Sequence, residues 1–399
     1  MNLQLLPPII QAEPWLAGLG LRFNPFRHLE AANDPYLGSY LVSHQRFAVA
    51  WEEHPALIFA PAGGGKTALR MYAAHAYWLS QGRAQPFPIP YLATAGAAIS
   101  PEAHQRGIVQ AGAVALLIGL IHHPDLLLEC DRADRRRVAD LLDAMLPAPL
   151  SYYVAMLTDL SDPTPVLLLL EKSYRLPSAS HLPLVRELCA VLQDAGSGVP
   201  ANADAADRLA LLLEVLLEVL HFRTIILQLD GVDASADTGI TPAFMADWLA
   251  WPLTQALRWA EQGIILKGFL PSELAAHLTH NFPEPLAHMQ QATITWTPPL
   301  LVEVIRRRVY EASNGKIGSL DAISSPALRD VDTQLACGTP PLPRETILLV
   351  GRLFAAYAQR TGGTSGQQLE PADLAAAQTA YSEHYVEPGP LDDRGIPCH

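Results

Sequence analysis

The amino-acid sequence predicts an α/β fold in which a parallel sheet is flanked by helices, carries a large helical insertion and is followed by C-terminal helices. Three observations support this prediction. A short apolar run enters a glycine loop and then a helix at residues 57–74. A second apolar run, residues 224–230, ends in an aspartate. Between them, residues 101–221 have helical length and spacing almost throughout.

The glycine loop is the most specific feature of the sequence. Glycines allow the backbone to curl so that its N–H groups point at phosphate oxygens. The loop enters a helix N-terminus, where unpaired N–H groups and the helix dipole favour an anion. Lys66 would reach the β- and γ-phosphates, and the Thr67 hydroxyl would ligate Mg²⁺. We expect nucleotide binding by Ala60, Pro61, Ala62, Gly63, Gly64, Gly65, Lys66, Thr67 and Ala68.

This loop departs from the usual phosphate-binding pattern at one position, because Ala60 stands where the first glycine is expected. The alternative interpretation is a glycine-rich turn that precedes a lysine by chance. Lysine occurs only four times in the chain, at residues 66, 172, 267 and 316. Its placement directly after three glycines therefore favours the phosphate-binding interpretation.

The second landmark is the apolar run that ends at Asp230. Such a run predicts a buried parallel strand, whose carboxyl end lies at the sheet edge where open α/β folds bind ligands. Asp230 is therefore the second candidate Mg²⁺ residue, directly or through water. Gly231 follows it, and the next acid is Asp233.

Three further strands complete the predicted sheet. Residues 88–93 contain two prolines, which fit only an edge strand or a strand start. Residues 263–271 form another buried run, with Lys267 near its end, and residues 292–296 form the last strand. A lysine in an apolar strand is costly without a partner. Helices are expected at 300–309, 325–337, 346–360 and 371–385.

Composition restricts the functional class. The 399 residues have a formal net charge of -13, which disfavours non-specific nucleic-acid binding. The four cysteines lack metal or redox spacing, so we expect reduced thiols in the cytoplasm. The N-terminus lacks a basic region before a long apolar core, as a signal peptide would have. Apolar runs are too short or too interrupted to predict a membrane span.

The ordered motifs resemble those of P-loop ATPases of the AAA+ and STAND group over roughly residues 24–360, with the insertion poorly matched. The Asp-Gly-Val-Asp run resembles the extended Walker B motif of NACHT-type STAND proteins, although Ala234 replaces a usual glutamate. This resemblance implies that Asp233 orients the attacking water; the alternative is a surface turn residue. The resemblance implies γ-phosphate sensing by Lys267 and by Arg344, which follows a proline at a helix start. It also implies Tyr36 and Tyr40 as an adenine wall. The alternative for Lys267 is a side chain that snorkels out at the strand end. For Arg344 it is a surface arginine at a helix start, and for Tyr36 and Tyr40 it is ordinary core aromatics.

This resemblance implies a Mg²⁺-dependent ATPase that works as a nucleotide-driven switch, binds ATP and ADP and forms nucleotide-dependent homo-oligomers. We expect slow hydrolysis, because Gly231 occupies the position of a water-polarising glutamate, and a partner protein that supplies a sensor or effector. ATP is preferred over GTP only on family grounds. The alternatives are a scaffold with little turnover and an AAA+ regulator of DNA remodelling or transposition. The expected segments are 1–53 (N-terminal), 54–100 and 222–312 (ATPase core), 101–221 (insertion), 313–385 (helical lid) and 386–399 (tail).

Overall fold

A computed structural model of the chain describes eight stretches of the sequence. They are residues 14–42, 44–79, 86–93, 100–158, 182–193, 203–233, 241–364 and 366–384. These residues form two compact units. Unit 1 comprises residues 44–294, and unit 2 comprises residues 14–42 together with 295–384. Residues 14–42 therefore group with the C-terminal helices, whereas the predicted tail lies outside the described residues.

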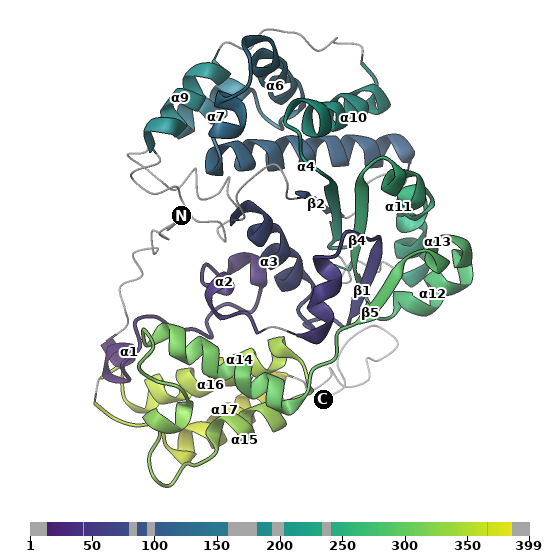
Figure 1. The fold of residues 1–399 in the computed structure, drawn as a ribbon. Helices are drawn as coiled ribbons and strands as arrows, with labels where there is room; N and C mark the ends of the chain where they lie inside the picture. The colour runs from purple at the N-terminus through teal and green to yellow at the C-terminus, as the bar shows by residue number, and fades with distance from the viewer. Residues whose placement is uncertain are drawn as a thin grey trace, which may run out of the picture. The chain divides into compact units, whose positions relative to one another are not determined.

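Within the described residues, five parallel strands form the sheet of unit 1, in the order β2-β3-β4-β1-β5 (Figure 1). They are β1 (Ala56–Ala60), β2 (Phe87–Leu92), β3 (Ile225–Asp230), β4 (Ile264–Pro271) and β5 (Gln290–Thr293). Every residue of β1, β3 and β4 is buried. Both faces of these strands are covered, which explains their continuous apolar sequences. The predicted α/β fold with a parallel sheet is confirmed.

The position of β2 at the edge of the sheet explains its two prolines. The N–H of Phe87 donates to Thr224 O at 2.7 Å, and the N–H of Ala93 donates to Asp230 O at 2.9 Å. Odd-numbered residues of β2 therefore face β3, and Pro88 and Pro90 face away from it. Because Pro88 and Pro90 have no N–H group, the free edge of β2 has fewer hydrogen-bond donors with which a strand of another chain could pair.

Helices cover both faces of the sheet. α3 (Lys66–Leu79) follows β1 on one face, and α11 (Pro242–Glu261) lies between β3 and β4 in sequence and covers the other (Figure 1). Alternate residues of β3 show this division. Leu227 belongs to the apolar cluster that includes α11, whereas Asp230 contacts Arg70 of α3. Shorter elements complete unit 1: η2 (Gln45–Ala50), α12 (Leu274–Asn281) and α13 (Pro283–Ala287).

The insertion between β2 and β3 is helical, as the sequence predicts. Its described helices are α4 (Pro101–His122), α5 (Asp125–Leu128), α6 (Arg132–Met145), α7 (Leu150–Thr158), α9 (Leu182–Leu192), α10 (Ala205–Glu214) and the π-helical turn Val215–Val219. α4 is long and apolar enough to cross a membrane by length and composition alone, as is α6 with α7 if that strongly bent pair counts as one span. However, 67% of the relevant α4 window is buried. α4 packs against β2, α6 and α10, so it is the core helix of the insertion.

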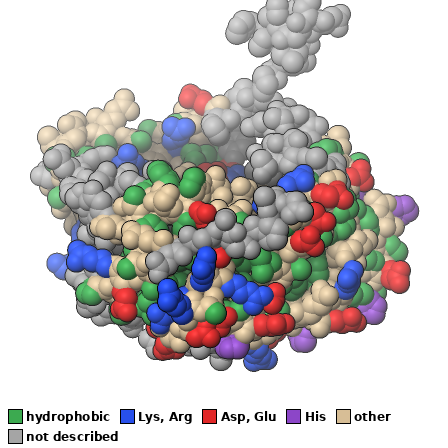
Figure 2. All heavy atoms as spheres, turned by 90° about the horizontal axis from the view of Figure 1, so that it is seen from above, with side chains coloured by type: hydrophobic (Ala, Val, Ile, Leu, Met, Phe, Trp, Pro, Cys, Tyr) green, Lys and Arg blue, Asp and Glu red, His purple; other side chains and the backbone are tan. Residues whose placement is uncertain are grey.

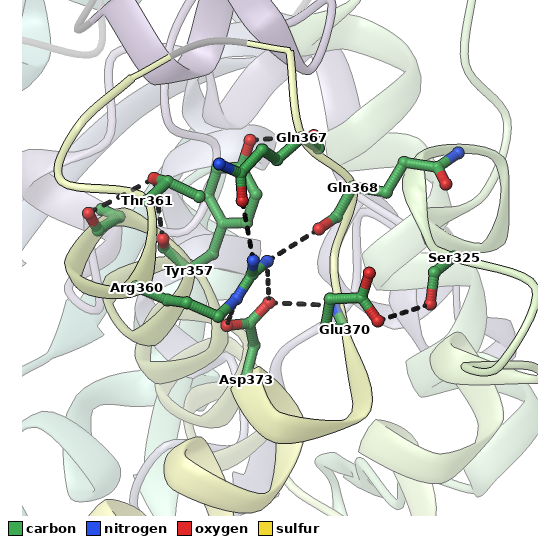
Figure 3. A network of polar contacts seen from close by, with 9 residues as sticks. Ser325, Tyr357, Arg360, Thr361, Gln367, Gln368, Glu370 and Asp373 are labelled. Carbon is green, nitrogen blue, oxygen red and sulfur yellow. Dashed lines mark hydrogen bonds and ion pairs between the residues drawn. The ribbon is translucent and has the colours of Figure 1, made fainter.

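Unit 2 is built from helices of both ends of the chain. They are α1 (Pro14–Gly18), η1 (Ala31–Asn33), α2 (Leu37–Tyr40), α14 (Pro298–Ala312), η5 (Leu320–Ile323), α15 (Val331–Cys337), α16 (Pro343–Arg360) and α17 (Pro371–His384). Trp15 packs edge-on against Phe354 of α16, with ring centroids 5.8 Å apart. Arg360 at the end of α16 binds both carboxylate oxygens of Asp373 in the first turn of α17 (Figure 3). This bidentate pair fixes the turn between the two helices.

The structure corrects two predicted elements. The helix expected over residues 325–337 begins only at Val331. Asp330, the residue before it, has a left-handed φ of 52°, which a continuous right-handed helix over residues 325–337 could not contain. The last strand is Gln290–Thr293, not residues 292–296. Thr297 is then the N-cap of α14, in which prolines occupy the first turn.

Candidate functional site

The glycine loop leaves the carboxyl end of β1 and enters α3. Gly63 and Gly65 have φ angles of 74° and 91°, which side chains of L-residues rarely adopt. A Cβ on Gly64 would lie 2.9 Å from both the Ala60 Cβ and the Pro61 carbonyl oxygen. The loop backbone therefore requires glycine at all three positions, so its shape is dictated by these residues and is not an accident of composition.

Lys66 lies at the start of α3 and is 6% exposed. Its Nζ donates to the carbonyl oxygens of Ala60 at 3.0 Å and Pro61 at 3.2 Å. It also forms an ion pair with Asp233 Oδ2 at 3.0 Å. Lys66 and Asp233, which the sequence predicts to act in one site, are thus in direct contact.

Asp230 ends β3 at the same edge of the sheet. Its Oδ2 pairs with Arg70 Nε at 3.0 Å, and both side chains are 2% exposed. Its Oδ1 accepts the N–H of Gly231 at 2.9 Å. Strand β4 lies between β3 and β1 in the sheet. Arg70 comes from α3, the helix that follows β1, and therefore reaches across β4 to contact Asp230 at the end of β3. The fold is that of a P-loop NTPase.

These residues offer a limited set of Mg²⁺ ligands. Within the described residues, no group of three His, Cys, Asp or Glu side chains could hold a metal. Mg²⁺ bound with nucleotide needs fewer, because it takes phosphate oxygens and waters and only one or two protein oxygens. The Thr67 hydroxyl could supply one such oxygen. Asp230 fits through a bound water, because the adjacent Arg70 charge opposes direct coordination while unused carboxylate lone pairs can still accept hydrogen bonds.

Lys267 does not lie where a γ-phosphate sensor is expected. It is fully buried, and it pairs in register with Ala56 at the other end of β1 from the loop. Ala56 lies four residues before Ala60, which corresponds to about 13 Å along a strand. Its Nζ donates to Val49 O of η2 at 2.6 Å. We therefore correct the predicted role: Lys267 is an internal anchor for η2. The residue that reaches the loop from this strand is Ser272, whose N–H donates to Ala60 O at 3.1 Å.

Tyr40 also has a role that differs from the predicted one. It is 3% exposed in unit 2, its hydroxyl donates to the Asp34 carboxylate, and the Arg308 guanidinium carbon lies 4.3 Å from its ring centroid. Arg308 pairs with Asp34 at 3.2 Å. A ring enclosed in this way is core and has no free face for a base. Core aromatics are the alternative that the sequence left open.

Tyr36 and Arg344 remain candidates in unit 2. Tyr36 is partly exposed and stacks on Phe23, with ring centroids 3.7 Å apart and planes 6° apart. Arg344 lies in the first turn of α16 and pairs with Glu30 at 2.9 Å, with side chains 38% and 59% exposed. Such exposed pairs contribute little to stability and exchange partners readily. The adenine-binding role of Tyr36 and the sensing role of Arg344 stay predictions.

Arg70 is the site residue that sequence reasoning missed. After Lys66 it is the only Lys, Arg, Asp or Glu in α3, and it lies four residues after Lys66, on the same face of the helix. An isolated charge on a helix that must cover an apolar sheet predicts a buried partner. The sequence therefore carries the signal for a charged residue at this place, although it does not identify Asp230 as the partner.

Comparisons with known proteins add little beyond the fold. No protein-family model matches the sequence, and no curated protein matches it. Among solved structures, the ORC2 protein of Aeropyrum pernix, in ADPNP-ADP complexes, aligns with a TM-score of 0.39 and 12% identity over 87% of this chain and 65% of that one. The ORC1 protein of the same organism, in complex with DNA, gives 0.41 and 13% over 89% and 69%. The chain thus spans about two thirds of each, and likeness at this level carries no argument about function.

Proposed function

We propose that this protein is a Mg²⁺-dependent ATPase of the AAA+ and STAND group that works as a nucleotide-driven switch. The observation that carries the proposal is the loop between β1 and α3. It combines two glycines at positive φ, a third with no room for a Cβ, and Lys66 at the N-terminus of α3. A helix N-terminus preceded by such a loop binds phosphate groups through backbone N–H groups.

The side chains around the loop suit this chemistry. Lys66 and the loop N–H groups would hold the β- and γ-phosphates, and Thr67 would ligate Mg²⁺, with Asp230 reached through water. Mg²⁺ would neutralise charge that develops on the phosphates. Asp233 lies 3.0 Å from Lys66 and is 23% exposed, and in this proposal it would accept a proton from water near the terminal phosphate.

Four charged side chains balance within this site. Two cations, Lys66 and Arg70, each pair with one carboxylate, Asp233 and Asp230 respectively. Within the described residues, these four charges therefore cancel before a phosphate binds, and Lys66 is the cation nearer the loop. Because Arg70 is fixed by its buried partner, we assign the binding of phosphate to Lys66 and the support of the Asp230 carboxylate to Arg70.

A scaffold with little turnover is the second candidate, and one observation favours it. Gly231 stands where a water-polarising glutamate is usual in AAA+ enzymes, and residues with a side chain adopt its φ of 80° only with strain. Turnover would then depend on Asp233. Asp233→Ala should abolish turnover without any loss of ATP binding if the protein is an ATPase. Unchanged turnover would remove Asp233 from the mechanism.

DNA binding, as in a remodelling or transposition regulator, remains a hypothesis. Each arginine of the Arg306–Arg308 run has a carboxylate partner inside unit 2: Asp332, Glu303 and Asp34. On the face drawn in Figure 2, Lys and Arg side chains lie among Asp and Glu side chains. Steeply salt-dependent DNA binding by the ATP-loaded protein would support the hypothesis, because phosphate contacts release counterions.

The decisive experiment measures Mg²⁺-dependent ATP hydrolysis together with molecular mass in solution. Wild type, Lys66→Ala and the control Lys316→Ala, which removes an exposed lysine of unit 2, are compared. Mass is read with ADP and with a non-hydrolysable ATP analogue. We expect turnover that is lost only in Lys66→Ala and a homo-oligomer that forms only with the analogue. Equal turnover in wild type and Lys66→Ala would contradict the proposal.

A further inference from the structure

The Lys66 ammonium group is engaged by three oxygen atoms, as many as it has N–H donors. Its Nζ donates to Ala60 O at 3.0 Å and to Pro61 O at 3.2 Å, and it forms an ion pair with Asp233 Oδ2 at 3.0 Å. The two carbonyl oxygens belong to the end of β1 and to the loop itself, so they stay beside Lys66. A phosphate oxygen that takes a hydrogen bond from Lys66 in this geometry must replace Asp233.

The Asp-Gly-Val-Asp run positions Asp233 for this contact. Gly231 turns the chain with a φ of 80°, and its N–H is held by the Asp230 carboxylate at 2.9 Å. Val232 is 5% exposed and belongs to the apolar cluster of unit 1. The turn is therefore anchored at its start by Asp230, which Arg70 holds, and at its middle by Val232. Asp233 is the next residue, and it returns to Lys66.

We propose that Asp233 competes with the nucleotide phosphates for Lys66 and thereby sets the affinity of the site for nucleoside di- and triphosphates. This inference rests on the proposed binding of nucleotide at the loop. One anionic acceptor replaces another, so the net cost of binding includes separation of the Lys66–Asp233 pair. The Asp233 side chain is 23% exposed and can be hydrated after release, whereas the buried Asp230 cannot move in the same way.

The competition links binding to the predicted role of Asp233. While Asp233 is paired with Lys66, its Oδ2 is engaged. Displacement by phosphate frees the carboxylate beside the terminal phosphate, where it can accept a proton from water. One residue then opposes binding in the nucleotide-free protein and assists hydrolysis in the bound protein, so its removal should move affinity and turnover in opposite directions.

The test is a titration of the full chain with ADP in excess chelator, so that no metal contributes. Asp233→Ala and Asp233→Asn are compared with wild type and with Asp247→Asn, which removes an exposed aspartate of α11. We expect both Asp233 variants to bind ADP about tenfold tighter or more, the scale of one charge-assisted hydrogen bond, and Asp247→Asn to match wild type. Equal or weaker binding by both Asp233 variants would overturn the inference.

A double-mutant cycle with Lys66→Met separates competition from a general effect of removing negative charge. If Asp233 acts through Lys66, Asp233→Ala brings no gain in the Lys66→Met background, whether ADP binding there is weak or undetectable. If Asp233→Ala still tightens ADP binding in the Lys66→Met background, the effect of Asp233 is a long-range electrostatic one, and the proposed competition for Lys66 is overturned. Failure of the nucleotide function itself has a different signature, because then neither wild type nor any variant binds ADP.

Discussion

Arg70 and Asp230, 160 residues apart in sequence, form an ion pair of 3.0 Å in which each side chain is 2% exposed. The pair joins the helix after the glycine loop to the end of β3, across the intervening strand β4. It therefore fixes both the distance between the two landmarks of the sequence and the start of the turn that carries Asp233.

Arg70→Met should destabilise unit 1 strongly. It leaves a buried carboxylate without its counter-charge, which costs about 3–5 kcal/mol, whereas Arg70→Met combined with Asp230→Asn should recover part of that loss. The urea midpoint of unfolding measures the effect. Arg258→Met, at an exposed arginine of α11, is the matched control and should stay near wild type. A single variant as stable as the control would show that the pair does not support the fold.

Gly64→Ala should weaken nucleotide binding by about tenfold or more, because the new Cβ would lie 2.9 Å from two loop atoms and displace the N–H groups from phosphate. The control is Gly318→Ala, where a Cβ would meet nothing within 4 Å. Fluorescence titration with a labelled ADP compares them. Comparable binding by the two variants would mean that the loop does not require this backbone shape.

Lys267 should make stability depend on pH in the alkaline range. Burial lowers the pKa of Lys267 to about 8, below the value near 10.4 of an unfolded chain. Between these values the unfolded state binds more protons, so wild-type stability should rise with pH relative to Lys267→Met, by up to about 1.4 kcal/mol per pH unit. Below pH 8 the difference should be constant. Parallel stability curves from pH 7 to 10 would contradict this account.

The same variant tests the corrected role of Lys267. An anchor for η2 has no reason to distinguish ATP from ADP, so Lys267→Met should keep the wild-type ratio of affinities for ADP and a non-hydrolysable ATP analogue. A γ-phosphate sensor would lose that distinction. The ratio, measured by calorimetry, reports the sensing role separately from any general loss of stability.

Arg308→Met should destabilise unit 2, because Asp34 is 1% exposed and would lose its ion pair. We expect a loss of about 3–5 kcal/mol, measured by denaturant unfolding. Arg307→Met is the neighbouring control. Its pair with Glu303 has side chains 46% and 43% exposed, so it should cost no more than about 1 kcal/mol. Equal effects would contradict the assignment of Arg308, Asp34 and Tyr40 to one buried cluster.

The sequence predicts those parts of the site that are local. The loop, the start of α3 and the acid at the end of β3 follow from residue types and spacing over ten residues or fewer. The proline-containing edge strand follows from the missing N–H groups alone. These features depend on backbone chemistry, which the sequence states directly.

Features that depend on distant pairing could not be predicted. The place of Lys267 depends on the register of β4 against β1, and a lysine within an apolar run gives no register. The pairing of Arg70 with Asp230 and the enclosure of Tyr40 by Arg308 join segments 160 and 268 residues apart. Only the folded sheet and helices bring such side chains together.

The measurement that tests the central claim most directly is calorimetric titration of ATP with Mg²⁺ into wild type, Lys66→Ala and Lys316→Ala. The loop geometry predicts saturable binding by wild type and Lys316→Ala, and binding weakened about tenfold or more in Lys66→Ala, which loses a charged phosphate contact. Equal affinity in all three proteins, or no binding by wild type, would contradict a nucleotide site at this loop.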